Sequence, residues 1–575
     1  MQAVRVLPDV PAIAKTFDYL VPDALRGQVR VGDVVRIDLH GRRVGGWVVE
    51  VDVTPPADVT LRPIAKRSGL GPPLELIELA HWAAWRWAGR PASFLKTASP
   101  ERVVQALPAP RPNRAPAPRV GPVLRAALED GRAIVRLPPG ADLVAVAAVV
   151  ADRGNALIVC PTVFMATRIA TVLRRSGLPI AHHPSEWAAG AAGATVVGAR
   201  GVVWAPVAEL ATVLVLDEHD ESHQQEQSPT WHARELAIER AARAGVPCVL
   251  TSPCPTLEAL EWGNLHTPER ARERSGWPVV QVVDRRDEDP RSAGLLSAAL
   301  TRLLRSDQRV LCVLNRKGRS RLLACASCGE LARCAVCEAA VQQPQHELAC
   351  ARCGATRPVV CVHCGATTLK NVRAGVSRVR EELEALVGEP VAELTASSGS
   401  DEATTRVVVG TEAMLQRIGR ADAVVFLDLD QELLAPRYRA AEQALGLVAR
   451  AARVVSAGAR SPGRDTGRLV VQTRLPDHEV VQAAVHADPG RVSAAERDRR
   501  RLLDLPPYSA MAEVSGDGAA AFIEALDTPE EVQVAEVGPS RWLLRAPDHE
   551  RLCNVLAEVR RPPGRLRIEV DPLRA

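Results

Sequence analysis

Four Cys-x-x-Cys pairs lie between residues 325 and 364, and they constrain the fold of this chain more than any other feature of its sequence. Each pair places two thiolates about one turn apart, so it can hold two corners of a tetrahedral Zn²⁺ site. Four such knuckles predict two sites of four cysteines, and a site with four protein ligands is structural because it keeps no open position. Spacing alone does not show which knuckles share a metal. The expected ligands are Cys325, Cys328, Cys334, Cys337, Cys350, Cys353, Cys361 and Cys364.

The assignment of these cysteines to metal depends on a reducing compartment. The first residues contain no apolar leader, and the chain has no run of 18 apolar residues, so we expect a cytoplasmic protein without a membrane span. In that compartment clustered cysteines usually bind metal, and the alternatives are an iron–sulfur centre or unliganded thiols. The net charge of +4 permits a polyanionic partner without requiring one. The other cysteines stand in apolar stretches and are interpreted as core residues: Cys160, Cys248, Cys254, Cys312 and Cys553.

The rest of the sequence predicts an α/β protein of several domains. Short apolar runs alternate with helical stretches on both sides of the cysteine cluster, a pattern typical of parallel sheets covered by helices. At the N-terminus, alternating apolar and polar residues with Gly and Pro predict a β-rich domain, and a proline-rich run predicts a stiff linker. The expected units are a β-rich domain (1–100), a linker (101–122), a first α/β lobe (123–285), the start of a second lobe (286–320), the two-zinc module (321–370), the rest of the second lobe (371–475) and a small α+β domain (476–575).

Paired α/β lobes occur in helicase motors, whose first lobe binds ATP through a loop of the form G-x4-G-K-[ST]. The corresponding loop here reads LPPGADL over residues 137–143. Pro138 and Pro139 have no N–H to offer a phosphate, the loop has no lysine, and Asp142 would repel the nucleotide. We therefore expect no nucleotide-binding residues and no bound ATP.

An acidic pair, Asp217 and Glu218, ends the apolar run VLVL. In a motor, such a pair holds Mg²⁺ and polarises the attacking water. Acidic residues at strand ends are common, so this signal is weak by itself. We interpret the pair as vestigial, with Mg²⁺ binding as the alternative, and expect no catalytic residues.

These landmarks together resemble the primosomal protein N′ (PriA) family of replication-restart DNA helicases. The similarity covers nearly the whole chain, and the eight-cysteine pattern is its most specific part. The family's D-E-E-H box is shortened here to D-E-H, and its arginine motif has lost both glycines but keeps Arg450 and Arg453. These departures, like the altered loop, affect the coupling of ATP hydrolysis to DNA movement, which predicts a degenerate branch without a motor. Other stretches that carry the resemblance are FDYLVP (17–22), GARGVVWAP (198–206), LVLDEHDESHQQEQSPTWHARELA (214–237) and FLDLDQELLAPRYRAAEQAL (426–445).

The resemblance also implies site residues. It implies two RecA-like lobes, and it pairs the outer knuckles (Cys325, Cys328, Cys361, Cys364) on one zinc ion and the inner knuckles (Cys334, Cys337, Cys350, Cys353) on the other. It further implies a pocket for the 3′ end of a nascent strand at Phe17, Asp18 and Tyr19, with Arg62 as a further DNA contact. An aromatic ring can stack on the terminal base, and Asp18 can accept a hydrogen bond from the 3′-OH. The residues alone leave open that Phe17 and Tyr19 are alternate positions of a core strand.

By resemblance, the protein is expected to bind stalled forks and nascent 3′ ends and to promote primosome assembly. The implied partners are DNA, the replicative helicase that it would help to load, and other primosome proteins, with the single-stranded-DNA-binding protein as a further candidate. Two alternatives remain open at this point. One is an active ATP-dependent 3′-to-5′ helicase with an unorthodox phosphate loop, and the other is a zinc-ribbon assembly protein that does not bind DNA.

Overall fold

The computed structural model describes residues 2–574 except 11–12, 14, 55–59, 287–294, 315–322, 345–346, 372–375, 396–403, 460–466 and 527–528. Its N-terminal domain is a five-stranded antiparallel sheet in the order β2-β1-β4-β3-β5. In β3, Val35, Ile37 and Leu39 are buried and Arg36 is exposed, the period-2 pattern of a half-buried strand. The elements are β1 (Ala3–Pro8), β2 (Phe17–Leu20), β3 (Val34–Leu39), β4 (Arg42–Val51) and β5 (Lys66–Gly69), followed by α1 (Leu74–Arg86) and α2 (Pro91–Ala98).

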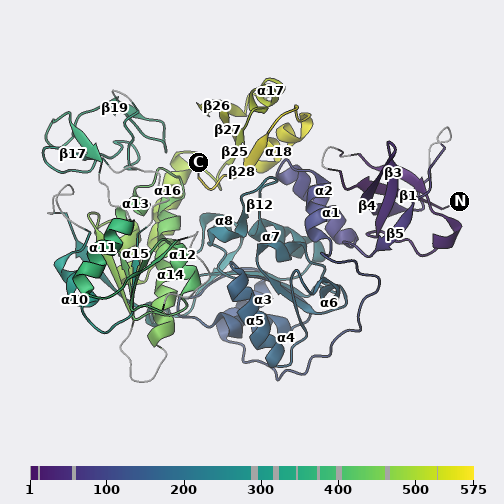
Figure 1. Ribbon diagram of the computed structural model, residues 1–575, viewed down its shortest axis with the longest axis horizontal. Helices are drawn as coiled ribbons and strands as arrows, with labels where there is room; N and C mark the ends of the chain where they lie inside the picture. The colour runs from purple at the N-terminus through teal and green to yellow at the C-terminus, as the bar shows by residue number, and fades with distance from the viewer. Residues whose placement is uncertain are drawn as a thin grey trace.

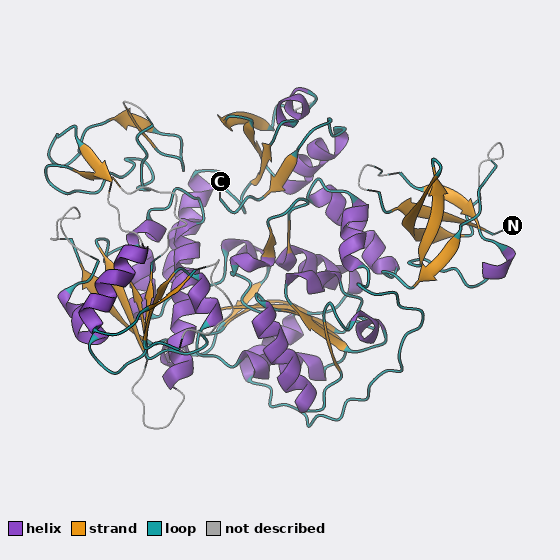
Figure 2. Cartoon of the chain, viewed as in Figure 1, coloured by secondary structure: helices purple, strands orange, loops and turns teal. Residues whose placement is uncertain are grey.

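The first lobe contains a seven-stranded sheet in which all neighbouring strands are parallel, in the order β14-β6-β13-β10-β7-β9-β8. Helices α3–α5 cover one face and α7 and α8 cover the other (Figures 1 and 2). The strands are β6 (Arg132–Arg136), β7 (Ala156–Val159), β8 (Ile180–His182), β9 (Thr195–Gly198), β10 (Thr212–Val215), β13 (Cys248–Ser252) and β14 (Asn264–His266). The helices are α3 (Pro122–Asp130), α4 (Leu143–Asp152), α5 (Val163–Arg175), α6 (Trp187–Ala191), α7 (Ala233–Ala244), α8 (Leu257–Trp262) and α9 (Arg270–Ser275), and a short hairpin pairs β11 (Gln224–Gln225) with β12 (Trp231–His232).

The second lobe contains a six-stranded parallel sheet in the order β15-β24-β23-β16-β22-β21. Its first strand, β15, lies inside residues 123–285, the range expected for the first lobe, but pairs with β24 of the second sheet. The expected boundary at residue 285 therefore falls too late in the chain. The apolar pattern of a strand does not show which of two sheets it joins. The strands are β15 (Val279–Asp284), β16 (Val310–Val313), β21 (Ala392–Leu394), β22 (Val407–Gly410), β23 (Ala423–Phe426) and β24 (Arg468–Thr473). The helices are α10 (Ala298–Leu304), α11 (Val376–Val387), α12 (Ala413–Arg417), α13 (Asp430–Leu433), α14 (Ala440–Ala459) and α15 (Glu479–His486).

The cysteine-rich segment forms a separate module beside the second lobe (Figure 1). It consists of two short antiparallel pairs, β17 (Leu323–Cys325) with β20 (Leu369–Asn371) and β18 (Glu347–Ala349) with β19 (Thr356–Pro358). Its backbone is anchored to the lobe because the N–H of Ala340 donates to the carbonyl of Leu434 at 2.8 Å.

A C-terminal domain completes the chain, next to both the first lobe and the N-terminal helices (Figure 1). Its sheet has the order β26-β27-β25-β28 and is antiparallel. Arg500 of the preceding helix is fully buried, and its guanidinium pairs with Glu258 of the first lobe and Glu442 of the second. This arginine therefore ties the two lobes together. The elements are α16 (Gly490–Leu502), β25 (Ala510–Ser515), α17 (Ala519–Glu524), β26 (Gln533–Gly538), β27 (Arg541–Ala546), α18 (His549–Glu558) and β28 (Arg567–Val570).

No helix in the part of the chain that the structure describes is both long and apolar enough to cross a membrane.

Candidate metal centres, DNA-end domain and nucleotide cleft

The eight clustered cysteines form two groups of four. In each group the Sγ atoms all lie within 4.8 Å of one another, and the Sγ pairs between knuckles are 3.5–3.6 Å apart. A tetrahedral zinc ion with Zn–S bonds of about 2.3 Å requires sulfurs about 3.8 Å apart, so both groups fit this metal. The structure pairs outer with outer and inner with inner knuckles, as the resemblance implies. The groups are Cys325, Cys328, Cys361, Cys364 and Cys334, Cys337, Cys350, Cys353.

The knuckle turns explain why glycine follows three of the four pairs. Gly329, Gly354 and Gly365 have φ between +74° and +80°, a region that disfavours residues with a Cβ. At Gly329 the turn closes through its N–H, which donates to the carbonyl of Cys325 at 3.0 Å. The five other cysteines are all buried, as expected for core residues, and burial raises the pKa of Cys248 and Cys312 to about 12.

The residues expected to bind a 3′ end lie on β2 at the edge of the N-terminal sheet. Tyr19 is 4% exposed and packs in the domain core, as in the alternative that makes it a core residue of the strand. Phe17 is half-buried against the same core. Asp18 lies on the other face of the strand, and both of its oxygens accept hydrogen bonds from Arg5 at 2.9 and 3.3 Å. The Arg62 side chain is exposed, and its carbonyl accepts from the N–H of Leu20, so it lies directly beside β2.

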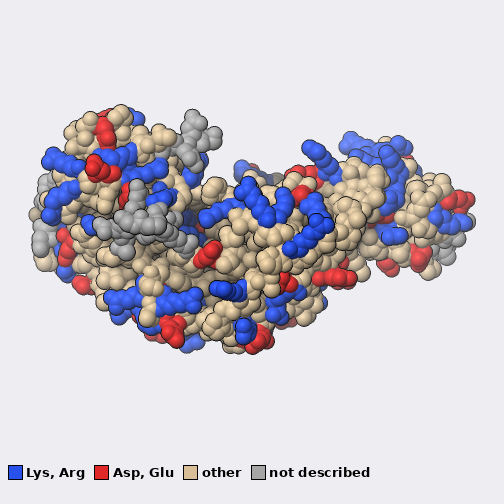
Figure 3. All heavy atoms as spheres, turned by 90° about the horizontal axis from the view of Figure 1, so that it is seen from below, with Lys and Arg blue, Asp and Glu red and all other residues tan. Residues whose placement is uncertain are grey.

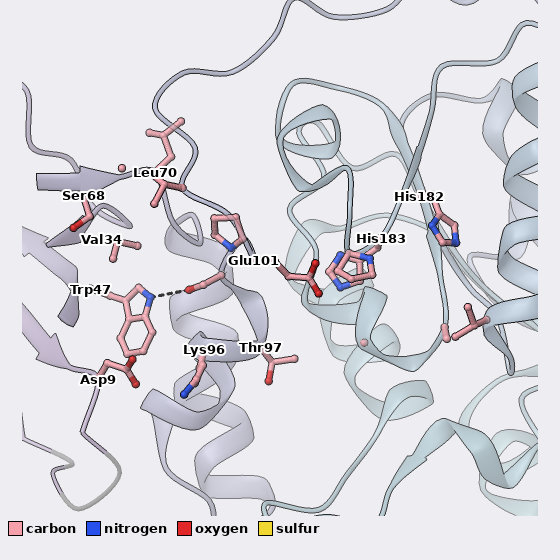
Figure 4. A pocket seen from close by; sticks show the side chains of 18 residues that line it. Asp9, Val34, Trp47, Ser68, Leu70, Lys96, Thr97, Glu101, His182 and His183 are labelled. Carbon is pink, nitrogen blue, oxygen red and sulfur yellow. Dashed lines mark hydrogen bonds between the residues drawn. The ribbon is translucent and has the colours of Figure 1, made fainter. Parts of the chain in front are cut away.

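A pocket of about 690 Å³ lies between the N-terminal domain and the first lobe (Figure 4). Trp47, Lys96 and Thr97 line it from one side and His182 and His183 from the other. His182 ends β8 and His183 follows it, so the pocket opens at the carboxyl end of parallel strands, where ligands bind in open α/β sheets. Burial lowers the pKa of His183 to about 4, with a smaller contribution from the neighbouring charges, and its Nδ1 has no hydrogen-bond partner among the residues that the structure describes. Sequence reasoning missed this site because its residues come from segments far apart in the chain.

Three N–H groups of the loop at the position of the phosphate loop already bind the protein's own carbonyls. The N–H groups of Leu137, Gly140 and Ala141 donate to protein carbonyls at 2.9–3.0 Å, and the two prolines between them have no N–H. Asp142 is the N-cap of α4, and its carboxylate accepts from the N–H of Val144 at 3.0 Å and, more weakly, from that of Ala145. An anion at a helix N-terminus is favourable, and here the chain supplies that anion itself.

The carboxylates of the acidic pair after β10 are likewise bound by the protein's own groups. Asp217 is bound through both oxygens by Arg453 of α14, with an Nη2–Oδ1 distance of 2.8 Å. Burial acts to raise the pKa of Asp217, but the charge and hydrogen bonds of Arg453 hold it below its usual range. Glu218 is fully buried, and it accepts hydrogen bonds from Arg234 at 2.9 Å and from the backbone and hydroxyl of Thr256.

A second contact between the lobes lies one helical turn away. Arg450 of α14 pairs with Asp220 of the first lobe at 2.7 Å, which holds the pKa of that carboxyl far below its usual range in spite of burial. Arg450 and Arg453 thus join the two lobes through ion pairs with Asp220 and Asp217. The sequence showed both arginines, but it did not show that their partners are the acidic residues of the other lobe. Their i, i+3 spacing on one helix face is the only local signal of a shared role.

The fold and these sites define a multidomain α/β protein with two parallel-sheet lobes, an inserted pair of Cys₄ groups and an N-terminal antiparallel domain. Residues 5–100 match the family of the PriA 3′ DNA-binding domain (3'BD). A probable replication restart protein PriA of Mycobacterium bovis is 30% identical over 617 residues, covering 96% of this chain and 90% of that protein. That of Mycobacterium leprae is 28% identical, with 98% and 99% covered. The chain belongs to the PriA family of replication restart proteins.

Other relatives match only in part. The replication restart protein PriA of Bacillus subtilis is 28% identical over 351 residues, and the match spans 43% of that protein and 56% of this chain. Among solved structures, S. cerevisiae Dbp5 bound to RNA and ADP BeF3 superimposes with a TM-score of 0.34 at 11% identity, over 67% of this chain and 98% of that one.

Proposed function

We propose that this protein is a replication restart factor that binds stalled-fork DNA and nascent 3′ ends, and promotes primosome assembly and loading of the replicative helicase without unwinding DNA itself. The absence of unwinding is supported by two contacts between and within the lobes. Asp142 caps α4 where a nucleotide phosphate would bind, and Arg453 binds the Asp217 carboxylate. Family membership and the matched 3′ DNA-binding domain support the first half.

In this proposal the N-terminal domain recognises the DNA end. Asp18 is on the face of β2 away from the core, and Arg5 holds its carboxylate in place, so a free oxygen lone pair can accept from a 3′-OH. Arg62 beside it would contact a phosphate. Phe17 is the half-exposed aromatic that can stack on the terminal base, whereas Tyr19 supports the strand from the core.

The two Cys₄ groups would hold structural zinc, which ties distant strands of the module into one unit. Each ion would contribute on the order of 10 kcal/mol to local folding. The module is attached to the second lobe through Ala340, and Arg352 lies 3.8 Å from the fully buried Glu496 of α16, which precedes the C-terminal sheet. It would therefore present a rigid surface to primosome proteins, the replicative helicase among them.

Fork binding is tested with two substrates that differ only in a 3′-OH or a 3′-phosphate on the nascent strand. We expect tighter binding of the 3′-OH fork, and Asp18→Ala should remove that difference. Asp23→Ala is the matched control, because Asp23 is an exposed carboxylate of the same domain that forms a surface ion pair with Arg26. Equal binding of both forks by the unmodified protein would disprove the end pocket, and no fork binding at all would favour an assembly protein without DNA.

The absence of a motor is tested by ATP turnover with fork DNA. We expect none, because three of the loop's N–H groups already bind protein carbonyls, two of its residues are prolines, and it has a negative charge and no lysine. Glu218→Gln is a better probe than Glu218→Ala, since the glutamine can still accept from Thr256 while it loses the carboxylate charge. Turnover that this substitution abolishes would restore the active-helicase alternative.

A further inference from the structure

The linker between the N-terminal domain and the first lobe is fixed on the surface of that lobe. Residues 101–121 contain no helix, and most of their side chains are exposed. Yet the N–H of Arg114 donates to the carbonyl of Gly177 at 3.0 Å, and Ala115 and Val120 pack against the lobe's core. Gly177 has φ +100°, and a Cβ there would meet the Arg114–Ala115 backbone at 3.0–3.1 Å, so the linker approaches it closely. The linker's arginines are therefore held at a defined position on the surface of the first lobe.

Helix α5, which ends at Arg175, two residues before Gly177, carries further arginines beside this segment. Arg168 and Arg175 are exposed and seven residues apart, two turns along one face, whereas Ile169 and Leu173 are buried on the opposite face. Seven residues of helix span about 10 Å, which corresponds to about three base-pair steps of duplex DNA at 3.4 Å each.

The charge of this surface is not balanced by nearby carboxylates. The ion pairs that the structure shows here join Arg111 and Arg174 to Glu186. Within the described residues, Arg114, Arg119, Arg168 and Arg175 have no acidic partner in ion-pair distance. Figure 3 views the molecule from the side of α3–α5 and shows Lys and Arg side chains gathered across the middle of that face.

We propose that this linker surface, made of Arg114, Arg119, Arg168 and Arg175, binds the phosphate backbone of duplex DNA next to the end held by the N-terminal domain. The inference rests on the proposed function, since it assigns the duplex arm of the same DNA. Two observations favour DNA: the unpaired positive charge, and direct continuity of the linker with the matched 3′ DNA-binding domain. A competing occupant is an acidic amphipathic protein segment, because Phe164 and Val172 are exposed on the same helix.

The test measures fork binding by fluorescence anisotropy between about 50 and 200 mM salt. One variant carries Arg114→Ala, Arg119→Ala, Arg168→Ala and Arg175→Ala. A matched control replaces four exposed arginines of the second lobe and the C-terminal domain, Arg302, Arg305, Arg560 and Arg565, by alanine. A third variant replaces the linker-surface arginines by lysine. Each phosphate contact contributes about 0.9 to the magnitude of the slope of log K against log salt. The slope of the first variant should therefore be smaller in magnitude by up to about 3.6. The control and the lysine variant should keep the slope.

The outcomes separate this inference from the proposed function. A reduced slope with the 3′-OH preference retained supports the linker surface. An unchanged slope in a variant that still prefers the 3′-OH fork overturns the inference and leaves the proposed function intact. If the variant keeps fork binding but loses a polyglutamate peptide that the control retains, the surface binds an acidic protein segment and the inference is also overturned. Failure of the unmodified protein to bind forks would instead remove the proposed function.

Discussion

Replacing Arg453 by alanine is expected to weaken the contact between the two lobes. The Asp217 side chain is 4% exposed, and both of its oxygens are bound by this guanidinium. Removal of one partner leaves a buried charge uncompensated, which costs about 3–5 kcal/mol in proteins. The Arg453 side chain is itself 28% exposed, so water can reach part of the site, and we expect the lower end, about 3 kcal/mol.

The assay is thermal unfolding of four proteins: the unmodified chain, Arg453→Ala, Asp217→Asn and the double variant. At about 2–4 °C per kcal/mol for units of this size, Arg453→Ala should lower the Tm by about 6–12 °C. Asp217→Asn removes the charge that Arg453 compensates, so the double variant should lose less than the sum of the single losses. The exposed Arg302→Ala serves as the control. Additivity of the two effects within about 0.5 kcal/mol would refute the reasoning, because residues that do not interact behave that way.

Three further outcomes are expected. Metal analysis should find two zinc ions per chain, one fewer after Cys334→Ser and no fewer after Cys553→Ser, whereas one zinc or iron in the unmodified protein would contradict the Cys₄ assignment. His183 is held neutral by burial, with a pKa lowered from 6.5 to about 4, so its contribution to stability is present above pH 6.5 and is lost as the pH falls toward 4. Between pH 6.5 and 4, the free energy of unfolding of His183→Gln should therefore fall by about 3 kcal/mol less than that of the unmodified protein, as measured by denaturant unfolding. Identical pH profiles of the two proteins would contradict this expectation. Replacing Arg67 by alanine should destabilise the N-terminal domain by a few kcal/mol in the same assay, because it leaves the buried Asp33 carboxylate without its partner at 2.7 Å.

The features that the sequence predicted well depend on residues close together in the chain. The spacing of the cysteines predicted two Cys₄ groups, and alternating apolar strands and helices predicted two parallel sheets. The features that it could not predict depend on partners far away in the chain. The helix that contains Arg500 is strongly charged and looks solvent-exposed, yet Arg500 is fully buried because Glu258 and Glu442 from different lobes meet it there. Tyr19 is another case, since a strand aromatic can face a ligand or a core, and only the packing decides.

Asp142 has a consequence for how this chain could change over time. As the cap of α4, its carboxylate contributes about 0.5–2 kcal/mol, so any substitution that vacates the helix end for a phosphate first weakens the fold. The missing lysine, the two prolines and the Arg453–Asp217 pair would each need a separate change before ATP could bind. Under the proposed function, regaining a nucleotide site would therefore begin with a change that weakens this helix end.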